Sequence, residues 1–237
     1  VADTNTARVA PKGETHIVIE PGEASKSWEE LQRILRHLLE ANLPRDGAVI
    51  GLGGGVVCDI AACAGSLYLR GCTVVLIPTS LLAMVDAALG GKTGINFGGY
   101  KNMVGTFYPA TEVRICTHLL HTLPEREYRS GLAEVIKSAL LGDESLLKML
   151  EDECTAIVRR EDALLEEIVW RSLMVKGMIV EEDLHETGRR AFLNLGHTFA
   201  HALEAVAGLG SWSHGEAVAW GIEQAMRLGE HMGITDT

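Results

Sequence analysis

The feature that most constrains the fold is a change of hydrophobic periodicity near the middle of the chain. From Thr15 to Arg114, short β-branched runs alternate with helical stretches, whereas Ala, Leu, Glu and Arg dominate after Leu119. Repetition of strand, helix and strand indicates a mostly parallel sheet with helices on its faces. We therefore expect an α/β N-terminal lobe with a Rossmann-like parallel sheet over residues 1–117. An all-α C-terminal lobe is expected over residues 118–237, where the spacing is helical.

The individual elements can be placed from the same patterns. The runs predicted as strands are His16–Glu20, Ala48–Gly53, Thr73–Pro78 and Glu112–Cys116, and the first two should be buried. The segments predicted as helices are Trp28–Leu43, Gly131–Leu141, Leu164–Asp183 and Gly215–Met232. Ligands of parallel sheets bind at the carboxyl ends of the strands, so the loops that follow these strands are the first places to search for a site.

Composition excludes several classes of function. A net charge of -11, without clusters of Lys and Arg, argues against a nucleic-acid partner. The apolar runs are too short for a membrane helix, so we expect no membrane partner. Five cysteines without a C-x-x-C pair are typical of reduced, buried thiols in a cytoplasmic protein. The chain begins at Val1 rather than Met, which suggests a trimmed or fragmentary chain.

Two loops in the first half have the chemistry to hold a nucleotide. The run GLGGGVVCD, Gly51–Asp59, follows a predicted strand and opens a helix, where bare backbone N–H groups can bind a pyrophosphate. Val56 stands where a G-x-G-x-x-G motif has its last glycine, so a tight structural turn is an equal alternative. In PGEASKS, Glu23 and Lys26 are candidates to contact a ribose or a phosphate, although an ordinary helix start capped by Ser27 fits as well.

The second half contains candidate metal ligands. His197 and His201 lie one helical turn apart on one face, but Thr198 replaces the Glu of a metalloprotease H-E-x-x-H helix. Glu134 lies on an otherwise apolar helix, and a buried carboxylate needs an ionic partner or a metal. The alternatives are a simple ion pair between Glu134 and Lys137, and histidines satisfied in the core or at the surface.

A resemblance to a known family joins these observations. The motifs that carry it are PGE, GGGVVCD, YLRG, IPTSLLAMVDAALGGKTGINFGGYKNMVGTFYPA, LPERE, GLAEVIK, RRAFLNLGHTFAHALE and HGEAVA, in that order between Pro21 and Ala219. Together they closely resemble 3-dehydroquinate synthase, a sugar-phosphate cyclase. The resemblance implies an NAD- and zinc-dependent lyase of the shikimate pathway, which leads to chorismate and the aromatic amino acids. Its substrate, 3-deoxy-D-arabino-heptulosonate 7-phosphate, would become 3-dehydroquinate and phosphate through oxidation by NAD, β-elimination, reduction, ring opening and aldol closure.

The family's functional residues carry over to matching positions of this chain. The implied metal ligands are Glu134, His197 and His214, for Zn2+ or for another divalent ion such as Co2+. The implied NAD contacts are Asp3, Glu23, Lys26, Gly54, Gly55, Asp59, Thr79, Ser80, Lys101, Thr122 and Glu127. The implied catalytic residues are Asp86, Lys92, Asn102, Lys137 and His201, and the implied substrate-binding residues are Arg70, Lys176, Arg190 and Asn194. The resemblance also implies a cytoplasmic homodimer, in which Arg70 reaches into the neighbouring site.

Some features depart from the family pattern. Ser80 stands where the family has a second Thr. Between a first strand at Asp3 and the strand at His16 there are too few residues for the expected crossover helix. The family also continues into further helices beyond Thr237, including one with a lysine that helps to hold the phosphate.

Other functions stay open at this stage. A sister cyclase that makes another cyclitol would use the same NAD and metal, although Arg190, Asn194 and His201 favour the dehydroquinate enzyme. A metal-dependent polyol dehydrogenase would have Asp as its first ligand and would leave the GGKTG motif unexplained. An inactive fragment that serves as an assembly partner is the third alternative.

Overall fold

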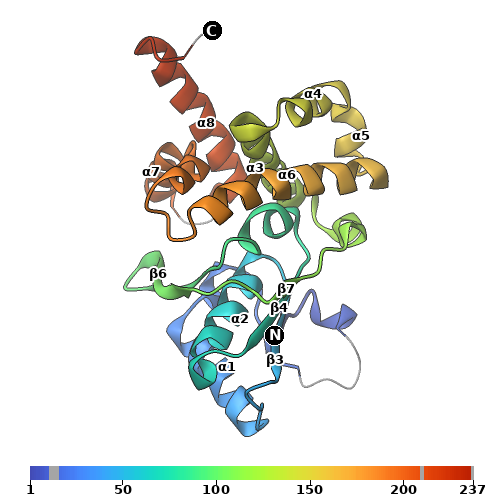
Figure 1. The fold of residues 1–237 in the computed structure, drawn as a ribbon, viewed down its shortest axis with the longest axis vertical. Helices are drawn as coiled ribbons and strands as arrows, with labels where there is room; N and C mark the ends of the chain where they lie inside the picture. Colours follow the sequence, from blue (N-terminus) through green and yellow to red (C-terminus); the bar gives the residue numbers. More distant parts are fainter. Residues whose placement is uncertain (11–15, 209–210, 236–237) are drawn as a thin grey trace. The chain divides into compact units, whose positions relative to one another are not determined.

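The structure is a computed structural model that describes residues 1–10, 16–208 and 211–235. The chain forms two compact units, Val1–Leu119 and Leu120–Thr237. Unit 1 runs from blue to green in Figure 1, and unit 2 from green to red. This division and the boundary predicted between residues 117 and 118 both fall within a short 3-10 helix, η5 (Thr117–Thr122).

Unit 1 is built on a parallel sheet of five strands in the order β2-β1-β3-β4-β7. The strands are β1 (Ala2–Asp3), β2 (Val18–Ile19), β3 (Ala48–Gly53), β4 (Thr73–Pro78) and β7 (Glu112–Val113). The long central strands β3 and β4 pair in register from Ala48 and Thr73 to Gly53 and Pro78. This sheet confirms the expected α/β lobe, and β3 and β4 have the predicted bounds.

The outer strands of the sheet differ from the prediction. The run His16–Glu20 was expected to be a buried strand, but only Val18–Ile19 pairs, at an edge, and Val18 is 39% exposed. The run Glu112–Cys116 is shortened to β7. An edge strand has a partner on one side only, so it is held by fewer hydrogen bonds. Strand β1 is present and parallel to β2, and the described part of their connection contains only the 3-10 helix η1 (Ala7–Val9).

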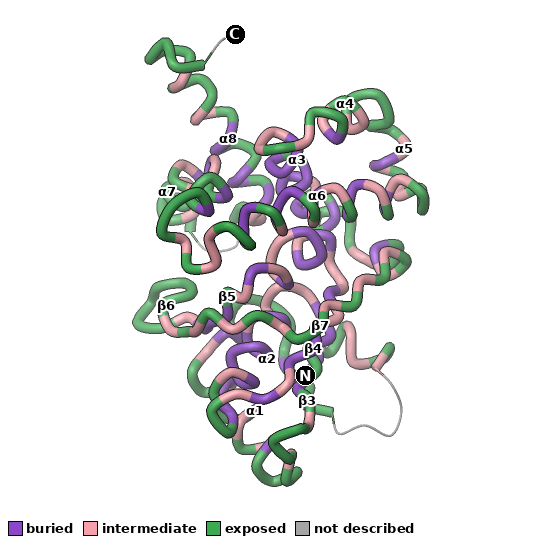
Figure 2. The backbone as a smooth tube through the Cα atoms, viewed as in Figure 1, coloured by how far each residue is buried: buried purple, intermediate pink, exposed green. Residues whose placement is uncertain are grey.

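Two helices pack on the sheet of unit 1. Helix α1 (Trp28–Glu40) begins at its predicted cap, where the Ser27 side chain accepts a hydrogen bond from the Glu30 N–H. Helix α2 (Gly55–Leu67) is buried along most of its length, and Figure 2 shows it largely in purple. Its thiols Cys58 and Cys63 are buried with Cys72, as expected. The expectation was wrong for two thiols that lie outside the cores, Cys116 and Cys154, which are exposed.

Unit 1 also contains a β-hairpin that was not predicted. Strands β5 (Lys92–Phe97) and β6 (Tyr100–Phe107) pair antiparallel. The two-residue turn between them is Gly98-Gly99, with φ values of 60° and 85°. Two consecutive positive φ values define a tight hairpin turn that glycine adopts without a steric penalty. Four short helices complete the described part of the unit: η1, η2 (Glu23–Ser25), η3 (Tyr68–Arg70) and a π-helical turn η4 (Ala83–Ala87).

Unit 2 is helical, as expected. After η5 its elements are α3 (Glu125–Gly142), α4 (Glu144–Asp152), α5 (Cys154–Val158), α6 (Asp162–Glu182), η6 (Arg189–Asn194), α7 (His197–Ala207) and α8 (His214–His231). Helix α3 packs against α4, α6, η6 and α8 and forms the centre of the unit. It starts before the predicted residue Gly131, because Pro124 precedes a first turn rich in acidic side chains. Over the described residues, every helix is too short or too polar to span a bilayer.

Candidate functional site

The glycine turn lies at the carboxyl ends of the two central strands of unit 1. Gly54 caps α2, and the N–H of Thr79, which follows β4, donates to the carbonyl oxygen of Gly53 at 2.9 Å. A Cβ on Gly53 would lie 2.5 Å from Val57 Cγ2, so this glycine is required by packing whatever the loop binds. The N–H groups of the first turn of α2 have no acceptors within the helix and are suited to an anion. The sequence alternatives, a tight turn and a phosphate loop, are therefore compatible.

A buried lysine connects three of the predicted cofactor and catalytic residues. Lys26 is 4% exposed, and its Nζ lies 2.6 Å from Asp59 Oδ2 and also donates to Asn102 Oδ1. Glu23 Oε1 lies 3.9 Å from the same ammonium group. Burial raises the pKa of Asp59, more than the ammonium group of Lys26 lowers it. Through these bonds, Lys26 links Asp59 on α2 to Asn102 on β6.

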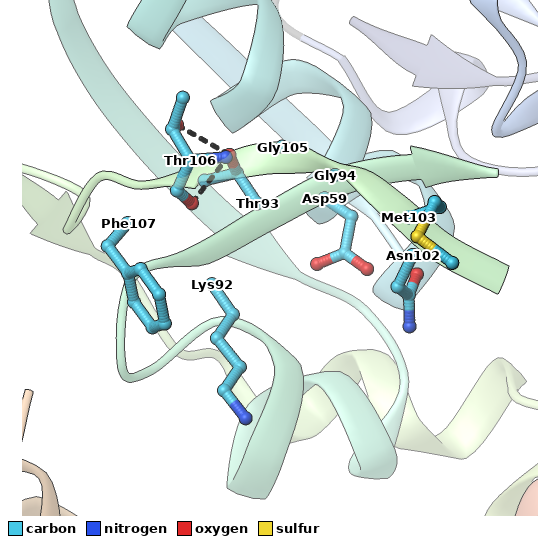
Figure 3. Close-up of a pocket in the computed structure, with 9 residues that line it drawn as sticks. All are labelled: Asp59, Lys92, Thr93, Gly94, Asn102, Met103, Gly105, Thr106 and Phe107. Carbon is cyan, nitrogen blue, oxygen red and sulfur yellow. Dashed lines mark hydrogen bonds between the residues drawn. The ribbon is translucent and has the colours of Figure 1, made fainter. Parts of the chain in front are cut away.

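A cleft of about 390 Å³ opens between α2 and the hairpin (Figure 3). Its lining residues are Asp59, Lys92, Thr93, Gly94, Asn102, Met103, Gly105, Thr106 and Phe107. The hydroxyl of Thr93 joins the two strands through hydrogen bonds to Thr106. The structure thus brings Asp59, Lys92 and Asn102, which the sequence analysis assigned to cofactor and substrate, to one cleft.

Of the remaining predicted residues of unit 1, some lie near the glycine turn and others lie far from it. Asp3 Oδ1 accepts from the N–H groups of Asn5 and Thr6, and the Thr6 hydroxyl donates to Leu52 O at 2.8 Å, beside the glycine turn. Arg70 is not brought to this group. It is exposed at the C-terminal end of α2, and a helix of 13 residues separates it from the glycine turn by about 20 Å. Ser80 lies beside Gly54, Asp86 lies in η4, and Lys101 is exposed on β6.

The main feature of unit 2 is a cluster of one carboxylate and two imidazoles. Glu134 is 1% exposed, and its Oε1 lies 3.3 Å from His214 Nε2 and 3.9 Å from His197 Nε2. One ligand atom from each residue lies within 4.8 Å of the other two. Tetrahedral Zn2+ with ligands at about 2.1 Å keeps them about 3.4 Å apart. The donor set and its spacing therefore fit a divalent ion with one position open for another ligand.

Close contacts between helices place these ligands. The N–H of Gly215 donates to Ser130 Oγ at 2.9 Å, and a Cβ on Gly215 would lie 2.0 Å from Ser130 O. The start of α8 can therefore touch α3 only because residue 215 is glycine. Ser213 and Glu216 form a capping box that defines this start, so His214 is the first helical residue. On the other side, Gly196 has φ of 80° and precedes His197 at the start of α7.

One buried cation pairs with this carboxylate, and two more lie on elements that pack against α3. Lys137 is 2% exposed and forms an ion pair with Glu134 Oε2, the oxygen not directed at the imidazoles. Lys176 on α6 and Arg190 on η6 are also buried, and both elements pack with each other. Burial lowers the pKa of His197, and the charge of Lys137 lowers it further, which favours the neutral imidazole that a metal needs. Among the buried described residues of unit 2, three cations thus accompany a single carboxylate.

The other predicted residues of unit 2 are exposed. The ring of His201 lies 5.6 Å from that of His197, one turn along α7. Asn194 Nδ2 donates to Glu186 Oε1 at 2.8 Å, and Asn194 lines a second cavity of about 280 Å³. Thr122 ends η5, and Glu127 lies in the first turn of α3. Both side chains are open to solvent.

Sequence reasoning missed residues that hold the site together. Asn96, on β5, contacts Glu23, Lys26 and Asn102 through its side chain and backbone. Arg160 donates to the carbonyl oxygens of Leu120 and Leu123, on either side of Thr122. The Gly-Gly pair after Phe97 was a usable signal for the hairpin that carries Asn96. Nothing in the local sequence marks Arg160, because its partners are about forty residues away.

The fold and the site together define a class of protein with a nucleotide-type glycine turn in an α/β unit and a metal-type cluster in a helical unit. Comparison with known proteins gives the same class. The chain is similar to a solved 2-epi-5-epi-valiolone synthase from Streptomyces hygroscopicus subsp. jinggangensis with NAD+ and Zn2+ bound, at 34% identity and a TM-score of 0.86, over 91% of this chain and 61% of that chain. It is also similar to a 2-deoxy-scyllo-inosose synthase complexed with carbaglucose-6-phosphate, NAD+ and Co2+, at 25% identity and a TM-score of 0.90, over 99% and 66%.

Sequence comparison specifies the family. The model described as 3-dehydroquinate synthase N-terminal matches residues 16–130, and the one described as 3-dehydroquinate synthase C-terminal matches residues 131–237. The 3-dehydroquinate synthase of Dichelobacter nodosus is 47% identical over 96% of this chain and 62% of its own length. That of Pseudomonas putida is 49% identical over 90% and 60%. The chain belongs to the 3-dehydroquinate synthase family, and it spans about three fifths of the length of these relatives.

Proposed function

We propose that this protein is a 3-dehydroquinate synthase, which converts 3-deoxy-D-arabino-heptulosonate 7-phosphate to 3-dehydroquinate and phosphate. The observation that carries the proposal is the cluster of Glu134, His197 and His214, with Lys137 paired to Glu134. Unit 2 also buries three cationic side chains, Lys137, Lys176 and Arg190, and buried charges contribute little to stability even when they are paired. A substrate with a phosphate and a carboxylate gives these cations a function.

The cofactors follow from the two donor sets. Glu134, His197 and His214 would hold the divalent ion, and zinc is the proposed choice, with Co2+ as an alternative. In unit 1, the glycine turn at Gly54 and Gly55 would hold the pyrophosphate of NAD. The other proposed contacts are Asp3, Glu23, Lys26, Asp59, Thr79, Ser80 and Lys101, with Thr122 and Glu127 from unit 2. When bound, NAD accepts and returns a hydride, and the ion polarises substrate hydroxyl groups.

The residues of the chain bind, orient and neutralise the substrate. Arg190 suits a carboxylate, because its planar guanidinium can donate two parallel hydrogen bonds. Lys137, buried beside Glu134, is proposed to stabilise negative charge on the substrate oxygen that loses its proton. Lys92, Lys176 and His201 are proposed to hold the phosphate, and Asp86 and Asn102 to orient the ring. The aldol closure is intramolecular, so holding one conformer supplies much of the catalysis.

The test is release of inorganic phosphate from the heptulosonate phosphate, using the full natural protein and NAD in catalytic amount. We expect phosphate and 3-dehydroquinate in equal amounts, no net accumulation of NADH, and loss of the activity after chelation that added Zn2+ or Co2+ restores. Full activity in a chelator, or none with NAD and metal supplied, contradicts the proposal.

The same assay separates the remaining alternatives. A sister cyclase is favoured by one observation, the 34% identity to the valiolone synthase. It would turn over a different sugar phosphate and leave the heptulosonate untouched. A polyol dehydrogenase would accumulate NADH, and an inactive fragment would release no phosphate with NAD and metal supplied. The homodimer and the role of Arg70 across its interface belong to the proposal, and a molar mass in solution tests the dimer.

A further inference from the structure

We propose that Asn96 is a positioning residue of the NAD site, a role that rests on the proposed function. Asn96 lies near the end of β5, two residues before the Gly98-Gly99 turn, and is half-buried. It belongs to none of the residues carried over from the family. It nevertheless contacts three of them, Glu23 in η2, Lys26 just after that helix, and Asn102 in β6.

The contacts use the side chain and the backbone of Asn96 together. Its Nδ2 donates to Glu23 Oε1 at 2.9 Å and approaches Glu23 O at 3.3 Å. Its backbone N–H donates to Lys26 O at 2.7 Å. Its Oδ1 accepts from the backbone N–H of Asn102 at 2.9 Å. One residue therefore ties the tip of the hairpin to the segment that follows β2.

Only a carboxamide can make this set of bonds. A carboxylate at position 96 would accept from Asn102 but would face the Glu23 carboxylate with a second negative charge. An apolar side chain would make neither bond. Asparagine carries a donor and an acceptor on one rigid plane, so it can satisfy an acidic side chain and a backbone N–H together. The identity of residue 96 is therefore tied to the charge of Glu23.

The bond to Asn102 also bears on the backbone. Asn102 has φ of 54°, a conformation that a residue other than glycine adopts at a cost. The Asn96 acceptor fixes the Asn102 N–H, and the Asn102 side chain in turn accepts from Lys26. Without Asn96, both ends of the Lys26 network lose an anchor, and Glu23 gains access to other rotamers. We expect the loss to appear in NAD binding, because Glu23 and Lys26 are proposed NAD contacts.

The experiment measures NAD binding by calorimetry, together with KM for NAD and kcat, in the full natural protein. For N96D we expect Kd and KM for NAD to rise about tenfold, about 1.4 kcal/mol, with kcat changed less than about twofold. N96A should show a smaller rise in Kd, because it adds no charge beside Glu23. The control is N42D, at an exposed asparagine that also has a positive φ, 52°, and whose side chain donates to Glu40 O on the surface. It should leave all three quantities unchanged.

A double-mutant cycle with Glu23→Gln tests the mechanism. The carboxamide that Glu23→Gln introduces can donate to the carboxylate of N96D, so the double variant should be less impaired in NAD binding than the product of the single effects, by about threefold or more. Strictly additive effects, or a fall in kcat at constant KM, would overturn the positioning role. The positioning role would also be overturned if N96D lowered the urea midpoint of the NAD-free protein enough to account for its weaker NAD binding. If the wild type itself fails to bind NAD, the proposed function fails instead, and the two failures are distinguishable.

Discussion

Replacement of Gly215 by alanine tests how the candidate metal cluster is assembled. The new Cβ would lie 2.0 Å from Ser130 O, and ordinary contact begins at 3.4 Å, so α8 must retreat from α3 by about 1.4 Å. Overpacking of this kind costs about 1–3 kcal/mol. Loss of the bond from Gly215 N–H to Ser130 Oγ adds about 1 kcal/mol. We expect Gly215→Ala to lower the free energy of unfolding of the metal-free protein by about 2–4 kcal/mol, measured in urea.

The same shift should weaken metal binding. His214 is adjacent to Gly215, and its Nε2 lies 3.3 Å from Glu134 Oε1, close to the spacing on a tetrahedral ion. A retreat of about 1.4 Å takes the pair beyond this spacing, and we expect zinc affinity to fall about tenfold or more, measured by competition with a chelating dye. Two variants serve as controls. Ser130→Ala removes the hydrogen bond without a clash, and Gly177→Ala adds a methyl group in a helix where nothing lies within 4 Å.

The controls make the prediction refutable. Ser130→Ala should cost about 1 kcal/mol and keep zinc affinity within about threefold. Gly177→Ala should be neutral or stabilising by up to about 1 kcal/mol, because alanine favours the helix. If Gly215→Ala is as stable as the wild type and binds zinc as tightly, the close approach of α8 to α3 does not set the cluster.

Two further predictions concern unit 2. The Asp183 carboxylate accepts from the backbone N–H of Thr187, and also of Arg190 and Gly188, which lowers the pKa of Asp183 to about 2. Its stabilising contribution is therefore present above pH about 4 and is lost as the pH falls toward about 2. Asp183→Asn should be less stable than the wild type at pH 7, with a gap in urea midpoint that narrows over this range; a gap independent of pH would contradict the reasoning. Arg160→Lys should lower the free energy of unfolding by about 1–3 kcal/mol, because one ammonium group cannot bond Leu120 O and Leu123 O while covering the ring of Tyr128. Arg159→Lys, at an exposed neighbour, should have no effect on the urea midpoint, and equal effects of the two substitutions would contradict this role of Arg160.

The sequence predicted the centre of the sheet better than its edges. Strands β3 and β4 were placed at their observed bounds, because a strand buried between parallel neighbours is a nearly continuous apolar run. Strands β2 and β7 were overestimated, since pairing rather than composition decides where an edge strand ends. The β5–β6 hairpin was missed although its Gly98-Gly99 turn is a strong local signal.

The site could be predicted only in part from local spacing. The spacing of His197 and His201 by one helical turn follows from helical periodicity, and so does the ion pair of Glu134 with Lys137. The convergence of Glu134 with His214 does not, because it depends on a contact between α3 and α8 that Gly215 permits. The resemblance to the family supplied the full set of implied ligands, Glu134, His197 and His214. The ion pair and the cluster were treated as alternatives, yet Glu134 takes part in both, one through each carboxylate oxygen.

The three donors of the cluster lie on three different helices, with both histidines at the first residue of a helix. Helical backbone is stiff, so we expect the donors to lose little freedom when an ion binds and to adapt poorly to a larger one. A scaffold of this kind selects by radius and coordination number. Ca2+, which takes six to eight oxygen ligands at longer distances, should therefore compete poorly with the small ions that accept nitrogen ligands, even where it is far more abundant.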